Sequence, residues 1–118
     1  MSKNIKEIKD EIKQFRDERN WDQYHNALDL AVAMSIECSE ILELIRFKSR
    51  DEVKQWLNNK ENKEKFSDEI ADVFIFLIAL CNSSKIDLEK AYKNKLKKNK
   101  EKYPIEKFYG KKEKYNEI

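Results

Sequence analysis

Hydrophobic residues recur every three or four positions along most of the chain, which is the spacing of one face of an α-helix. The first such stretch, with apolar positions from Ile5 to Phe15, predicts a helix over residues 2–19. The same spacing predicts further helices over residues 25–48, 51–57, 62–83 and 88–102. Polar turns separate them, and Asp22 and Asp87 are predicted helix N-caps. The pattern therefore predicts an all-α fold, an antiparallel bundle of four to five helices.

Composition supports the same fold class. The 118 residues include one glycine and one proline, which leaves little material for tight turns or sheets. A chain of this length forms one domain. We expect a single helical domain over residues 1–104 and a polar, loosely ordered tail over residues 105–118.

Two acidic pairs lie within the long apolar stretches. Glu37 and Glu40 form one pair, and Glu69 and Asp72 form the other. Residues three positions apart are neighbours on one face of a helix. Each pair falls on the arc of its helix that also carries the apolar residues expected to face a core. The four carboxylates are therefore predicted to point into the bundle.

Carboxylates that face a bundle interior cost on the order of several kcal/mol each unless something neutralises them. Mg²⁺, with Mn²⁺ as a substitute, prefers hard oxygen ligands and would offset that cost. The alternative is a set of buried ion pairs, because Lys65 lies one turn before Glu69 and Arg46 is within reach of Glu43. The spacing alone leaves both interpretations open.

The two cysteines, Cys38 and Cys81, lie within apolar helical stretches, and no CxxC or Cys/His cluster accompanies them. We therefore expect buried free thiols and a cytoplasmic location. The longest apolar run, residues 73–81, is far shorter than the ~20 residues that span a bilayer. No membrane partner is expected.

Basic residues are concentrated in the last predicted helix, although the net charge of the chain is only +2. There Lys95, Asn99 and Tyr103 recur at helical spacing and form a stripe of hydrogen-bonding and aromatic groups. Inward acids, lysines and aromatic rings suit a ligand that is anionic at one end and flat at the other, as a nucleotide is. The chain has no glycine-rich phosphate-binding loop, so metal ions and lysines would have to hold the phosphates.

Four short motifs resemble those of a known family. They are residues 21–25 (WDQYH), 37–40 (ECSE), 68–73 (DEIADV) and 99–104 (NKEKYP). In order and approximate spacing they resemble the MazG-like nucleotide pyrophosphohydrolases of the all-α NTP pyrophosphatase superfamily, and within it the dCTP pyrophosphatase branch. ExxE alone is a weak signal, but ExxE followed by ExxD and a later NxxxYP is fairly specific. The resemblance covers about residues 19–104.

The resemblance implies a Mg²⁺-dependent hydrolase that splits a nucleoside triphosphate into the monophosphate and pyrophosphate, and so clears unwanted nucleotides. It implies that Glu37, Glu40, Glu69 and Asp72 coordinate the metal, and that one of the glutamates orients or deprotonates the attacking water. Family members assemble as homodimers or homotetramers with sites completed across subunits. The positions that match substrate contacts are Trp21, His25, Phe47, Phe76, Lys95, Asn99 and Tyr103.

The aromatic positions depart from the family pattern. Phe47 and Phe76 stand where the dCTP pyrophosphatase branch tends to have tryptophan and tyrosine. Stacking on a base would persist, whereas a hydroxyl contact would be lost. Ala27 and Asp29 likewise replace a proline and an asparagine common after the pocket histidine. The acidic motifs are intact, and the preferred base is left undetermined.

Three other classes of protein fit parts of the pattern. A nucleic-acid-binding module would use the basic last helix, but nothing in it requires inward acids. A di-iron bundle expects two Glu-x-x-His motifs, and this chain has one histidine. A purely structural oligomer would tolerate hydrophobic residues in place of Glu40 or Asp72. We expect a nucleoside triphosphate as the partner and no nucleic acid.

Overall fold

The computed structural model describes residues 2–117 and contains only helices and connecting segments within that range. The helices are α1 (Ile5–Glu18), η1 (Asp22–Tyr24), α2 (Ala27–Ile45), α3 (Arg50–Leu57), α4 (Lys60–Ser84), α5 (Leu88–Lys102), α6 (Ile105–Phe108) and η2 (Tyr115–Glu117), where η marks a 3-10 helix. The predicted all-α class is confirmed. The chain divides into two compact units, Met1–Ile86 and Asp87–Ile118, which are described separately.

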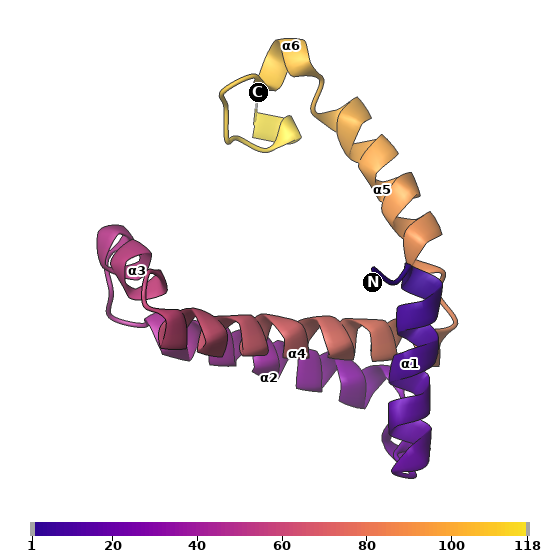
Figure 1. Cartoon of the computed structure of the whole chain (residues 1–118). Coiled ribbons are helices and arrows are strands. Elements are labelled where there is room, and N and C mark those ends of the chain that lie inside the picture. Colours follow the sequence, from indigo (N-terminus) through magenta and orange to yellow (C-terminus); the bar gives the residue numbers. More distant parts are fainter. Residues whose placement is uncertain (1, 118) are drawn as a thin grey trace. The chain divides into compact units, whose positions relative to one another are not determined.

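The core of the first unit is the pair formed by α2 and α4, which lie side by side and run in opposite directions (Figure 1). Leu30 on α2 is 2% exposed, and Ile78 on α4 is fully buried. Both helices are apolar on more than one side, so each can pack on several neighbours. Within residues 2–117, no helix is both long and apolar enough to cross a membrane.

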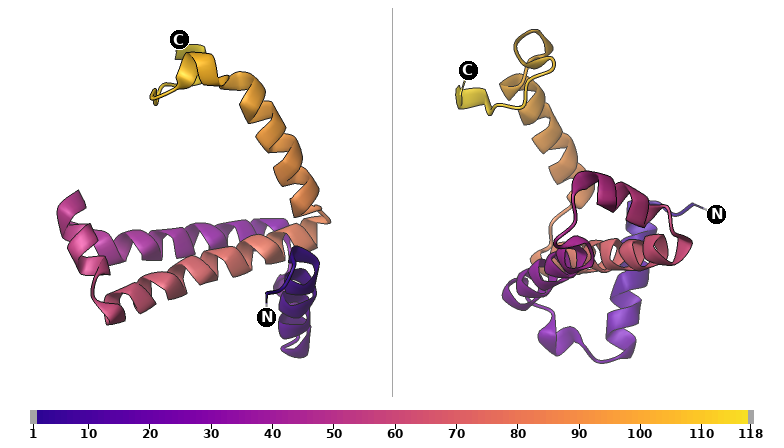
Figure 2. Two further views of the ribbon diagram at one scale, coloured as in Figure 1. Left: turned by 45° about the horizontal axis from the view of Figure 1, so that its top comes forward. Right: turned by 90° about the vertical axis from the view of Figure 1, so that its left-hand side faces the viewer.

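Helix α1 crosses the end of this pair where α2 begins and α4 ends, and α3 joins the two helices at the other end (Figure 2). The amide of Asn82 on α4 donates to the carbonyl of Lys9 on α1 at 3.3 Å, and Lys9 Nζ donates to the carbonyl of Ile86 at 3.3 Å. Cys81 is buried near this crossing. The predicted buried thiol is therefore correct for Cys81.

The same prediction is wrong for Cys38, which is free and exposed. It follows Glu37 on α2, and a step of about 100° per residue turns it away from the face that packs against α4. The error arises because α2 carries apolar residues on two faces and only one of them meets α4.

Polar side chains fix where the helices begin. Asn26 caps α2, because its side-chain oxygen accepts a hydrogen bond from the backbone N–H of Asp29 at 2.9 Å. The predicted cap Asp22 is wrong, since Asp22 lies in η1 instead. Asp87 caps α5 as predicted, and Ser49 forms a reciprocal capping box with Glu52 at α3.

The second unit consists of α5, α6 and η2. The ring of Tyr103, at the end of α5, contacts Phe108 edge-on at 4.8 Å and Tyr115 at 6.1 Å between ring centres. These contacts join the end of α5 to the chain that follows it. The predicted domain boundary at residue 104 stays a prediction.

Candidate functional site

Three carboxylates meet between the two central helices. Glu37 from α2 and Glu69 and Asp72 from α4 each place one oxygen within 4.8 Å of the other two. The antiparallel packing sets position 37 of α2 opposite positions 69 and 72 of α4. Glu37 and Glu69 are half-buried, so solvent screens their charges incompletely. We call these three residues the acidic group.

The electrostatics of the acidic group favour a bound cation. Burial raises the pKa of the Glu37 carboxyl, and the negative charges of Asp72, Glu69 and Glu40 raise it further. Among residues 2–117, no lysine, arginine or histidine forms an ion pair with the acidic group. No positively charged side chain in the described part of the protein is therefore in direct contact with these carboxylates. An oxygen-only set of ligands is what a hard divalent cation binds.

The alternative of buried ion pairs is not supported for these acids. Arg46 does pair with Glu43, at 3.2 Å, but both side chains are more than half exposed. Lys65 is exposed, and no ion pair joins it to Glu69 in the described range. Exposed pairs of this kind contribute about 0–1 kcal/mol and do not neutralise the acidic group.

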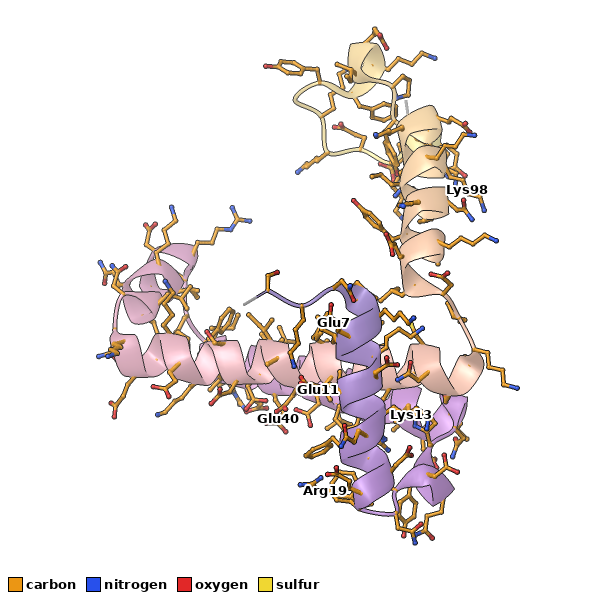
Figure 3. All side chains as sticks on the ribbon, turned by 45° about the vertical axis from the view of Figure 1, so that its right-hand side comes forward. Glu7, Glu11, Lys13, Arg19, Glu40 and Lys98 are labelled. Carbon is orange, nitrogen blue, oxygen red and sulfur yellow. The ribbon has the colours of Figure 1, made fainter. Side chains whose placement is uncertain are left out.

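Glu40 lies outside the acidic group and is exposed on α2 (Figure 3). It follows Glu37 by three residues, so the two side chains leave the helix in directions about 60° apart round the axis. Its negative charge is one of the causes that raise the pKa of Glu37. The structure thus separates one of the four predicted ligands from the other three.

Phe76 is the predicted substrate-binding residue that lies nearest the acidic group in the chain. It is half-buried on α4, one turn after Asp72 on the same side of the helix.

The predicted base-stacking residue Phe47 follows the end of α2 and is 91% exposed. Its φ of +63° is a left-handed conformation that phenylalanine rarely adopts. Such strain is typical of residues held for a function.

Trp21 and His25 flank the short helix η1, at the end of the first unit where α1 meets α2. Trp21 contacts Phe15 of α1 edge-on at 5.7 Å between ring centres. Burial lowers the pKa of His25, and the nearby positive charge of Arg16 lowers it further. His25 is therefore a neutral hydrogen-bonding group at neutral pH.

Lys95, Asn99 and Tyr103 lie in the second unit, on one side of α5. Lys95 is exposed and Asn99 is half-buried. These three residues belong to the second unit, whereas the acidic group belongs to the first. Their predicted contacts with the substrate stay predictions.

Sequence reasoning missed Arg16. It is 7% exposed, although arginine is seldom buried without a partner. The charged residues around it made it look like part of a solvated surface. The signal was its position one turn after Ile12, on the apolar face of α1.

Comparisons with known proteins define the class to which this geometry belongs. Residues 32–118 match the MazG-like family, so the chain belongs to that family. It is 30% identical over 105 residues to dCTP pyrophosphatase 1 of Rattus norvegicus, and 30% identical over 105 residues to dCTP pyrophosphatase 1 of Homo sapiens. Each match covers 89% of this chain and 62% of the relative, so the chain spans less than two thirds of the length of these proteins.

A solved structure supports the fold. The chain is 39% identical to a pyrophosphatase from Archaeoglobus fulgidus DSM 4304, with a TM-score of 0.79. That match covers 88% of this chain and 95% of the archaeal one. The predicted MazG-like fold is confirmed.

We predict that Glu37→Gln stabilises the metal-free protein at neutral pH. Because the folded state raises the pKa of Glu37, it binds more protons than the unfolded state in the window between the ordinary and the raised pKa. Stability therefore falls as pH rises through that window, and the loss persists above it. A glutamine cannot ionise, so the variant escapes this loss.

Urea unfolding of the wild type and Glu37→Gln, with divalent cations removed, from about pH 4 to pH 7 measures the effect. The advantage of the variant is expected to grow with pH. Glu64→Gln, at an exposed position of α4, is the matched control and should show no such trend. A Glu37→Gln variant less stable than the wild type at every pH would contradict the account.

Proposed function

We propose that this protein is a Mg²⁺-dependent nucleoside triphosphate pyrophosphohydrolase that converts a ribo- or deoxynucleoside triphosphate to the monophosphate and pyrophosphate. The observation that carries the proposal is the acidic group, whose oxygens lie within 4.8 Å of one another. Its charge is unbalanced by any ion pair within residues 2–117. The names of the related proteins, dCTP pyrophosphatase 1 and a pyrophosphatase, support the same reaction class. Removal of unwanted nucleotides is the biological role we propose.

We assign two roles to the four carboxylates: three of them would bind the cation, and one would accept a proton. Glu37, Glu69 and Asp72 would hold Mg²⁺, or Mn²⁺ in its place, and Glu40 is next to them. When bound, the cation would neutralise phosphate charge and lower the pKa of a coordinated water. The oxygen of the attacking water forms a new bond to the α-phosphorus. The bond between the α-phosphorus and the oxygen that bridges it to the β-phosphorus breaks, and pyrophosphate leaves with the electron pair. We assign Glu40 to accept the proton of the water, because its carboxylate is outside the acidic group.

The substrate-binding residues supply two kinds of contact. Lys95 and Asn99 offer a positive charge and amide hydrogen bonds to phosphate oxygens, and Tyr103 adds a hydroxyl and a ring. The aromatic residues Trp21, Phe47 and Phe76 offer flat apolar surfaces to the nucleoside, and His25 offers a neutral imidazole. Phe47 is exposed, and the guanidinium of Arg46 lies over its ring at 4.5 Å from the ring centre, so we propose that a base stacks on the opposite face of this ring.

A second copy of the chain is the partner we propose for the outer face of α2. Leu28, Val32 and Ile36 recur every four residues there and are 72%, 50% and 54% exposed. This stripe is roughly opposite Leu30 and Glu37, which face α4. Burying apolar area contributes about 25 cal/mol per Å², so a symmetric dimer that pairs these stripes is favoured.

The proposed reaction predicts pyrophosphate release from a panel of ribo- and deoxynucleoside triphosphates in the presence of Mg²⁺. Glu40→Gln and Asp72→Asn should each lower the rate by about a hundredfold or more, since one removes the proton acceptor and the other a metal ligand. Glu64→Gln is the control and should retain the wild-type rate. Release of orthophosphate, or no release by the folded wild type, would refute the proposed reaction.

The proposed dimer predicts that Val32→Glu, which places a charge in the outer stripe of α2, converts the oligomer to a monomer. Sedimentation velocity at matched protein concentrations measures the change. Gln55→Glu, at an exposed position of α3, is the control and should leave the oligomer intact. A wild type that sediments as a monomer, or a Val32→Glu variant that keeps the wild-type mass, would rule out this interface.

A further inference from the structure

A polar cavity lies away from the acidic group, at the end of the first unit where α1 crosses α4. It has a volume of about 380 Å³. Its lining comes from α1, from the segment before α2 and from the end of α4. The residues that line it are Lys13, Arg16, Asp17, Asp22, His25, Asn82, Ser83 and Lys85.

Arg16 is the unusual member of this lining. It is a charged residue, yet it is only 7% exposed to solvent. Its Nε is buried and has no hydrogen-bond partner among residues 2–117, and no carboxylate in that range forms an ion pair with its guanidinium. The ring of Trp21 covers it, with 5.7 Å between the guanidinium carbon and the ring centre. A shielded, unpaired cation is costly unless an anion joins it.

The remaining charges of the cavity leave Arg16 without a protein counterion. Lys13 Nζ donates to Asp17 Oδ2 at 2.6 Å, so these two opposite charges are paired with each other. Lys85 adds a further positive charge from the end of α4, against the single remaining aspartate, Asp22. His25 is neutral at neutral pH, because burial and the charge of Arg16 lower its pKa. The cavity therefore carries a net positive charge.

We propose that this cavity binds a phosphate-class oxyanion, with the guanidinium of Arg16 as its principal donor and Lys85 as a second cation. Guanidinium forms bidentate, charge-assisted hydrogen bonds with phosphate oxygens, which a point charge does not reproduce. Asn82 and Ser83 add uncharged hydrogen-bonding groups to the lining, and His25 adds a neutral imidazole. A volume of about 380 Å³ exceeds the needs of one phosphate group and allows for a larger phosphorylated molecule.

The cavity is separated from the acidic group along the helix pair. Asp72 and Asn82 both lie on α4, and at 1.5 Å per residue their backbones are about 15 Å apart. The proposed oxyanion site needs no metal, whereas phosphate oxygens approach the acidic group only with a cation between them. Phosphate binding that persists without divalent cations and depends on Arg16 therefore reports the cavity and not hydrolysis at the acidic group, although His25, which the proposed function assigns to the nucleoside, also lines the cavity.

Calorimetric titration of inorganic phosphate into the full chain, in low-chloride buffer stripped of divalent cations, tests the site. The wild type should bind phosphate saturably, and Arg16→Gln should weaken the affinity about tenfold or more, since a hydrogen bond to a charged group is lost. Arg19→Gln is the matched control at the C-cap of α1, where Arg19 stacks on Phe15 and does not line the cavity. Figure 3 labels Arg19 and the cavity residue Lys13 at different positions along α1. The control should bind within about twofold of the wild type.

A second variant and a second ligand make the outcome decisive. Lys85→Gln changes an exposed side chain, so it carries the test if Arg16→Gln fails to fold, and it should weaken binding severalfold. A nucleoside 5′-monophosphate that binds more tightly than phosphate, with a gain that Arg16→Gln removes, assigns the site to the phosphate of a nucleotide, whereas equal affinities assign it to free phosphate. The proposal fails if the folded wild type does not bind phosphate or if the cavity variants bind as the wild type does. It also fails if an uncharged nucleoside binds in a manner that depends on Arg16 while phosphate does not bind.

Discussion

Packing of α2 against α4 buries apolar side chains and, through the same register, forces carboxylates on the two helices to face one another. The favourable burial of Leu30 and Ile78 fixes how the helices lie, so the backbone at Glu37 cannot move away from Glu69 and Asp72 without loss of core contacts. Burial and the neighbouring charges then raise the pKa of Glu37. A folded protein can hold repelling charges in this way when packing contributes more than the repulsion costs, and the strain is relieved by a cation.

The helices and the acidic group were accessible from the sequence because both depend on local periodicity. Spacing of three and four residues is enough to place Glu69 and Asp72 on one face, whatever the rest of the fold does. Tertiary detail was less accessible. Glu40 and Cys38 lie on an apolar helix, and only the position of α4 decides that both are exposed. Periodicity identifies the faces of a helix, but it does not say which face a neighbour covers.

The burial of Arg16 was likewise not accessible from periodicity alone. It lies on a strongly charged helix, and its burial depends on the crossing of α1 over the end of α4 and on the ring of Trp21. The first unit thus holds an unbalanced negative group in the middle of its helix pair and an unbalanced positive cavity at one end.

The claim that the acidic group exists to bind a divalent cation is tested most directly by Mn²⁺ binding, followed through the electron paramagnetic resonance signal of the free ion. The account predicts saturable binding by the wild type and an affinity reduced by about tenfold or more in Asp72→Asn, with Glu64→Gln unchanged. A wild type that leaves the signal of free Mn²⁺ undiminished, or an Asp72→Asn variant that binds as tightly as the wild type, would contradict it.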